Sequence, residues 1–204
     1  MSSDDELAEA LAAAIAGDEA GFAALWRSLQ PAVLRYLRVV AADAAEDVAS
    51  ETWLQAARDL HRFDGGPAEF RGWLFRIARH RGIDHRRRAA RRPEEPAESV
   101  VDRGAAAPDA ATEVQARSDT DWALSLIASL PQDQAEAVML RVVAGLDVAA
   151  TARVLGKQPG AVRVAAMRGL RKLAALPQVQ DRSGFADPAR RPVRRSGVTR
   201  AGEV

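Results

Sequence analysis

Apolar residues recur every three or four positions along most of this 204-residue chain, and this spacing restricts the fold more than any other feature. Leu7, Leu11 and Ile15 begin the pattern. The most regular stripe lies further on and consists of Phe70, Trp73, Leu74, Ile77 and Ala78. Residues with this spacing share one face of an α-helix. Because period-two alternation and β-branched runs are scarce, the sequence predicts an all-α fold.

Changes in composition divide the chain into segments. Residues 1–92 and 119–176 carry the helical spacing, whereas residues 93–118 are rich in proline, alanine and acidic residues and contain almost no large apolar side chain. Such a segment cannot bury enough surface to fold alone, so we expect a flexible acidic linker. Residues 177–204 contain Gly, Pro and Arg without periodicity, and we expect a disordered basic tail. The sequence therefore predicts two small helical domains joined by a linker.

The net charge of +1 conceals four blocks of alternating sign. The formal charge is −7 over residues 1–60, +7 over 61–92, −8 over 93–136 and +9 over 137–204. Two basic blocks separated by acidic ones indicate two distinct anion-binding surfaces.

Several classes of protein are disfavoured by what the sequence lacks. It has no cysteine, and its start, MSSDDELAEA, does not resemble a secretory signal. No apolar run approaches the roughly 18–20 residues that span a bilayer, so we expect a soluble cytoplasmic protein without membrane contact. His80, Asp84 and His85 do not share one helix face well, which disfavours a metal site. No nucleophile–base pair, phosphate-binding loop or dinucleotide fingerprint occurs, so we expect neither enzymatic activity nor a cofactor.

The second basic block contains the spacing of a helix-turn-helix. The stretch GLDVAATARVLGKQPGAVRVAAMRGLRKL reads as a short helix, a break at Leu155-Gly156 and a second helix. On that second helix the apolar face is expected to consist of Val162, Ala166, Leu170 and Leu173. Basic residues spread over the opposite side, where a recognition helix would enter the major groove and arginine could bond guanine. A solvated basic face on an ordinary helix hairpin is the alternative interpretation.

The first basic block places an aromatic ring among arginines. In FRGWLFRIARHRGIDHRRRAARR, Arg71, Phe75 and Arg79 lie together beside the apolar stripe. Arginines that follow phosphates and a ring that stacks on unpaired bases are typical of single-stranded nucleic-acid binding. The alternative is that Phe75 extends the hydrophobic core.

Three stretches together resemble the extracytoplasmic-function group of the sigma-70 family of bacterial RNA polymerase initiation factors. They are AAEDVASETWLQAARDLHRF, FRGWLFRIARHRGIDHRRR and LPQDQAEAVMLRVVAGLDVAATARVLGKQPGAVRVAAMRGLRKL. The resemblance covers residues ~20–92 as sigma domain 2 and ~119–176 as sigma domain 4. It implies an initiation factor without enzymatic activity, with core RNA polymerase (its β′ clamp helices and β flap) and promoter DNA as partners. An anti-sigma factor is a further candidate partner.

The resemblance also implies roles for individual positions. The residues that match the core polymerase contact are Asp47, Ser50, Glu51, Leu54 and Arg58. The residues that match −10 recognition and melting are Phe63, Gly65, Gly66, Arg71, Phe75, Arg76, Arg79 and His80. The residues that match the −35 reader are Arg163, Val164, Met167, Arg168, Arg171 and Lys172. The linker matches the segment that the family threads near the polymerase active-site cleft.

Helical geometry adds an independent argument for the first of these sets. On the helix expected at residues 45–60, the inward face is predicted to comprise Val48, Ala49, Thr52, Ala56 and Leu60. Leu54 then lies among charged residues on the other side, where a binding partner could cover it. A single exposed leucine on a solvated face is the alternative.

Some positions depart from the family pattern. Ser50 and His80 stand where the family usually has Gln and often has Asn, and residues 150–152 read Ala-Thr-Ala in place of the common Glu-Ile-Ala. Val164 and Ala165 replace a frequent Ser-Arg pair, so the −35 sequence cannot be carried over from relatives.

The sequence leaves two alternatives to an initiation factor. One is a helix-turn-helix regulator in which residues 1–92 serve dimerisation or sensing. The other is a nuclease, which would need a carboxylate cluster in the basic blocks. Residues 61–92 hold only Asp64, Glu69 and Asp84, which argues against a nuclease.

Overall fold

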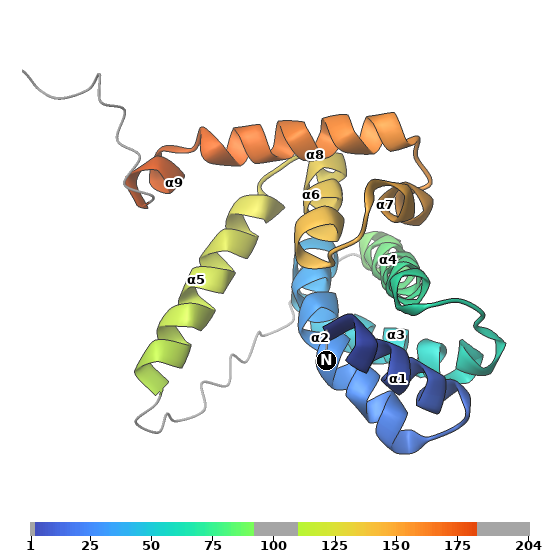
Figure 1. Ribbon diagram of the computed structural model, residues 1–204. Helices are drawn as coiled ribbons and strands as arrows, with labels where there is room; N and C mark the ends of the chain where they lie inside the picture. Colours follow the sequence, from blue (N-terminus) through green and yellow to red (C-terminus); the bar gives the residue numbers. More distant parts are fainter. Residues whose placement is uncertain (1–2, 92–109, 183–204) are drawn as a thin grey trace, which may run out of the picture.

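The computed structural model describes residues 3–91 and 110–182, and all regular secondary structure within these ranges is helical (Figure 1). This confirms the predicted all-α class. The remainder of the predicted linker and tail, residues 93–109 and 183–204, lies outside the described residues. In the same ranges, no helix combines the length and apolar character needed to cross a bilayer.

The N-terminal unit contains four α-helices and two short 3-10 turns. The helices are α1 (Ser3–Ile15), α2 (Glu19–Ala41), α3 (Ala45–Asp59) and α4 (Pro67–Arg91). The turns are η1 (Ala42–Ala44), between α2 and α3, and η2 (Leu60–Arg62), after α3.

Helix α2 forms the centre of this unit. Its start is fixed by Asp18, whose Oδ1 accepts a hydrogen bond from the Ala20 N–H at 3.0 Å, as expected of an N-cap. Its buried stripe consists of Leu25, Leu29, Val33, Tyr36, Leu37 and Val40. Helix α1 crosses α2 at Gly21, where an added Cβ would lie only 2.7 Å from the backbone nitrogen of Ala14. Trp26, on the same helix, is 44% exposed.

The C-terminal unit follows with five helices. They are α5 (Ala110–Ala128), α6 (Gln132–Val138), α7 (Val148–Leu155), α8 (Pro159–Ala174) and α9 (Pro177–Arg182), and a π-helical turn, η3 (Met139–Val143), extends α6. Helix α5 begins inside the range predicted as linker, and α9 lies inside the range predicted as tail. The guanidinium of Arg182 on α9 pairs with Asp119 and lies 4.6 Å from the ring centroid of Trp122, so α9 packs back on α5.

The two units pack against each other. Helix α7 lies beside α4, and α5 and α6 contact α2, so that one cluster of buried apolar residues runs through both units (Figure 1). An exposed ion pair joins α2 to α5, with 3.1 Å between Arg38 Nη1 and Asp121 Oδ1. The sequence predicts two helical domains correctly, but it does not predict this contact between them.

Candidate nucleic-acid and polymerase interfaces

The loop before α4 is held in place by aromatic rings and by a helix cap. The ring of Phe63 is half-buried, with its centroid 5.5 Å from that of Phe70 and 5.3 Å from that of Trp73. Gly65 has φ of 146°, a conformation that favours glycine. The Gly66 N–H donates to Glu69 Oε2 at 3.2 Å, which is the reciprocal half of a capping box. The sequence-predicted loop residues therefore form an ordered entry to the helix.

The expectation that Phe75 is exposed is wrong. Its side chain is fully buried, and its ring packs edge-on against Tyr36 of α2. Helix α4 is in contact with α2, α3 and α7, so its buried arc is wider than the single stripe that the wheel suggests. The alternative interpretation, that Phe75 extends the core, is the correct one.

The three arginines of α4 that were predicted to contact the −10 element differ in their exposure and in their partners. Arg71 Nη2 lies 3.0 Å from Asp4 Oδ1 of α1, and Arg79 Nε lies 2.6 Å from Glu136 Oε2 of α6. Arg76 is exposed. Of these three predicted −10 arginines, Arg76 is thus exposed, whereas Arg71 and Arg79 are half-buried and paired with carboxylates.

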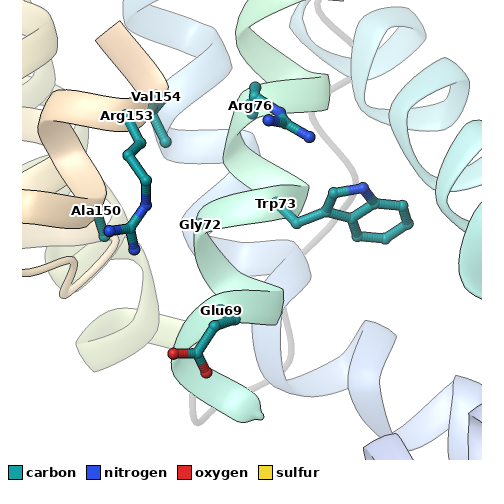
Figure 2. Close-up of a pocket in the computed structure, with 7 residues that line it drawn as sticks. All are labelled: Glu69, Gly72, Trp73, Arg76, Ala150, Arg153 and Val154. Carbon is teal, nitrogen blue, oxygen red and sulfur yellow. The ribbon is translucent and has the colours of Figure 1, made fainter. Parts of the chain in front are cut away.

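A basic groove of about 850 Å³ runs between α3 and α4. It is lined by Gln55, Asp59, Trp73, Arg76, Ile77, Arg79, His80, Arg81, Ile83, Asp84 and Arg87. The indole of Trp73 points to the α3 side of α4, away from α7 (Figure 2). A ring between arginines is the arrangement expected of Phe75, and the structure supplies it with Trp73 instead. Three groove residues, Trp73, Arg81 and Arg87, were not predicted as site residues. Trp73 was assigned to the apolar core stripe, which it fits equally well.

The exposed side of α3 carries all five residues expected to contact polymerase. Asp47, Ser50, Glu51 and Arg58 are exposed, and Leu54 is 58% exposed. The five residues predicted to face inward are all buried, which confirms that part of the wheel assignment. Leu54 is thus a large apolar side chain displayed among charged and polar neighbours.

The helix-turn-helix is built as the sequence predicts. Asp147 caps α7, with its Oδ1 2.6 Å from the Ala150 N–H, and Gly156 ends the helix in the left-handed region with φ of 65°. Pro159 then occupies the first turn of α8. These local signals set the turn between the two helices.

Helix α8 presents its basic face to solvent, and all six residues expected to read DNA are exposed. The predicted apolar face is incorrect at Leu170, which is 47% exposed. Gly169 is buried in its place, and a Cβ there would lie 2.8 Å from Val138 Cγ2 of α6. This close approach rotates the buried face of α8 by one residue.

In the described part of the chain, no group of three or more His, Asp or Glu side chains is arranged to hold a metal ion. The arrangement offers two separate cationic surfaces, on α4 and on α8, and one charged face with an exposed leucine, on α3.

Comparisons with known proteins agree with this arrangement. Sigma-70 region 2 matches residues 25–92, and sigma-70 region 4 matches residues 120–173. The ECF RNA polymerase sigma factor ShbA of Streptomyces griseus is 35% identical over 80% of this chain and 91% of its own length. The ECF RNA polymerase sigma factor SigD of Mycobacterium tuberculosis is 34% identical, over 83% of this chain and 82% of its own length.

A solved structure is also similar. CnrH, in complex with the cytosolic domain of CnrY, aligns with a TM-score of 0.59 and 25% identity, over 84% of this chain and 96% of that one. Regions 2 and 4, in this order on an all-helical fold, define a sigma-70-type transcription initiation factor. The chain belongs to the extracytoplasmic-function (ECF) group of these RNA polymerase sigma factors.

Proposed function

We propose that this ECF sigma factor divides promoter recognition among three surfaces. The exposed face of α3, centred on Leu54, binds core RNA polymerase. The α3–α4 groove holds the unpaired −10 strand, with Arg76, Arg79 and His80 near phosphates and bases. The exposed side of α8, beginning at Arg163, reads the −35 element, while the C-terminal unit also contacts the β flap.

The observation that carries this division is the chemical difference between the two cationic surfaces. The groove combines the indole of Trp73 with arginines, which suits stacking on unpaired bases. Helix α8 presents arginines together with exposed Val164 and Met167 on the second helix of a helix-turn-helix, which suits the major groove of duplex DNA. One surface thus fits melted DNA and the other fits duplex DNA.

Four residues of the predicted −10 set are given positioning roles. Phe63 and the Gly65–Gly66 turn shape the edge of the loop where a flipped base would enter, and Phe75 supports α4 from within the core. Arg71, paired with Asp4, lies at the start of the same helix. The direct contacts are therefore assigned to the groove residues.

The protein would act in the cytoplasm without enzymatic activity of its own, because initiation chemistry belongs to the polymerase. CnrH is seen in complex with the cytosolic domain of CnrY, and by analogy we propose an anti-sigma factor as a partner. The regulator alternative would require a sensing or dimerisation domain at residues 1–92, but region 2 of sigma-70 matches residues 25–92.

Run-off transcription tests the proposal. Core polymerase, the protein and genomic fragments are combined, and transcript 5′ ends are mapped. We expect discrete start sites that require both proteins, and poor promoter binding by the sigma factor alone. Specific duplex binding by the isolated protein, without any core-dependent transcript, would contradict the proposal and support the regulator.

A further inference from the structure

Helix α8 carries an uncharged stripe on the side that points away from the rest of the protein. The helix lies along one edge of the molecule, with α6 and α7 on its inner side (Figure 1). Its two buried residues are Val162 and Gly169. At about 100° per residue, Val164 and Met167 both lie about 140–160° around the helix axis from these two positions. Val164 is 41% exposed and Met167 is 44% exposed, so their side chains project outward.

The basic residues of α8 flank this stripe. Measured from the middle of the stripe, Arg163 and Arg168 lie about 70° to either side around the axis, and both are exposed. Arg171, one turn beyond Met167, ends the stripe. When such a helix lies in the major groove, its central side chains face the floor of the groove. Helix α8 therefore presents apolar groups to the floor and arginines to the two sides.

The stripe begins with a residue that has no side chain. Gly160 lies one turn before Val164 and is exposed, and a Cβ added there would have no heavy atom of the described chain within 4 Å. Glycine weakens a helix relative to alanine, and packing within the described chain does not require it here. A missing side chain lets a backbone approach its ligand closely. The short side chain of Val164 needs this approach in order to reach a base.

Apolar side chains discriminate among bases because they form no hydrogen bonds. In the major groove the C5-methyl of thymine is an apolar group, whereas guanine, adenine and cytosine present hydrogen-bond donors and acceptors. Val164 and Met167 would leave those polar groups dehydrated and unpaired, which is unfavourable. The same side chains gain stability by covering a methyl group. The stripe is therefore complementary to thymine.

The spacing of the two side chains sets the spacing of the thymines. Three residues of α-helix rise about 4.5 Å, and successive base pairs are about 3.4 Å apart. From this geometry we infer that Val164 and Met167 select thymine at two neighbouring base pairs of the −35 element, by contact with the C5-methyl groups. The inference rests on the proposed role of α8 in −35 recognition and names the chemical group that α8 reads.

Replacing thymine with uracil tests the inference at the level of one methyl group. Deoxyuridine pairs with adenine as thymidine does, but it lacks the C5-methyl. In a promoter mapped by run-off transcription, each thymine of the −35 element, on either strand, is replaced singly by deoxyuridine. Competition assays then measure binding by the protein together with core polymerase. We expect a loss of about fourfold in affinity at two neighbouring base pairs, and no comparable loss at the other thymines.

Substitutions assign each methyl group to a side chain. Val164→Ala should abolish the uracil effect at one of the two base pairs, and Met167→Ala should abolish it at the other. Leu170→Ala is the matched control, because Leu170 is 47% exposed on the same helix but lies only about 80–100° from Val162 and Gly169, outside the stripe. Its uracil effects should equal those of the wild type. Circular dichroism verifies that all three variants are folded.

A further variant tests the close approach of the helix. Gly160→Gln adds a side chain where the described chain leaves open space, so the protein should be at least as stable as the wild type. Promoter binding should nevertheless weaken by about fivefold or more, because the new side chain lies between the helix and the groove. Ala12→Gln, on the exposed side of α1, is the control and should bind normally. Normal binding by Gly160→Gln would contradict the contact between Val164 and a base.

Two results of the uracil experiment would overturn the inference. The first is wild-type binding that is indifferent to uracil throughout the −35 element, or an element without two neighbouring A·T base pairs. The second is a uracil effect that persists unchanged in both Val164→Ala and Met167→Ala. Promoter binding that does not depend on the −35 sequence at all would instead refute the proposed function of α8.

Discussion

The rings of Phe75 and Tyr36 meet edge-on, with centroids 5.5 Å apart and planes at 84° to each other. Both side chains are fully buried, so this contact ties α4 to α2 in the centre of the N-terminal unit. It explains why an aromatic residue stands between arginines on the helix proposed to bind DNA and yet is buried in the core.

We predict that Phe75→Ala destabilises the protein by about 3–5 kcal/mol, because it leaves a cavity beside Tyr36. His80→Ala, an exposed substitution on the same helix, should change the free energy of unfolding by less than about 0.5 kcal/mol. Urea denaturation followed by circular dichroism measures both. A Phe75→Ala protein as stable as the wild type would mean that the ring is not part of the core.

Tyr36→Phe should raise stability by about 1–3 kcal/mol, because it removes the buried hydroxyl that has no partner among the described residues. Burial raises the pKa of the Tyr36 hydroxyl well above its usual value of 10.0, and Glu136 adds to this effect. The unfolded chain therefore releases this proton first, so wild-type stability should fall as pH rises above about 10. Thermal denaturation should show a smaller alkaline loss for Tyr36→Phe; an equal loss would contradict the assignment.

Leu54→Asp should weaken binding to core polymerase by at least tenfold, a change of about 1.4 kcal/mol, because it places a charge at the centre of the proposed contact. Its melting temperature should stay close to that of the wild type, since Leu54 is exposed. Ala12→Asp, on the exposed side of α1, is a control with the same change in charge. A pull-down in which both variants bind core equally would show that this face is only solvated.

Arg163→Ala should relax preference at one or two −35 positions, at a cost of about 1–3 kcal/mol if Arg163 bonds guanine with both nitrogens. Arg27→Ala removes an exposed arginine from α2 and should leave selectivity unchanged. Selection from a library randomised at −35, in the presence of core polymerase, measures this. Unaltered selectivity of the Arg163→Ala protein would exclude Arg163 as a base contact.

Local signals in the sequence predict much of this fold. The spacing of Val48, Thr52 and Ala56 identifies the inner face of α3, and Asp147 with Gly156 marks both ends of α7. These features depend on neighbours within a few residues, which a single sequence displays. The cationic surfaces on α4 and α8 are likewise predicted by the basic blocks at residues 61–92 and 137–204, because a single sequence displays its charges.

The errors arise where distant segments meet. Phe75 is buried because α4 packs on several helices, and Leu170 is displaced because Gly169 admits Val138. A helical wheel assumes one buried arc centred on the largest apolar residues, so it detects neither effect. The Arg79–Glu136 ion pair is even harder to predict from the sequence, because its two residues are 57 positions apart and each resembles an ordinary surface charge.

Permanganate footprinting of a mapped promoter tests the central claim, that α4 opens DNA while α8 recognises duplex. The wild type with core polymerase should make thymines near −10 reactive. We expect Trp73→Ala, which removes the ring from the α3–α4 groove together with its contacts to Phe63 and Phe70, to bind the promoter with core but to leave those thymines protected, as stacking contributes about 1–3 kcal/mol per base. Arg163→Ala should lower occupancy, while the promoters that it does occupy still open. Normal thymine reactivity with a folded Trp73→Ala protein, or an opening defect confined to Arg163→Ala, would contradict the account.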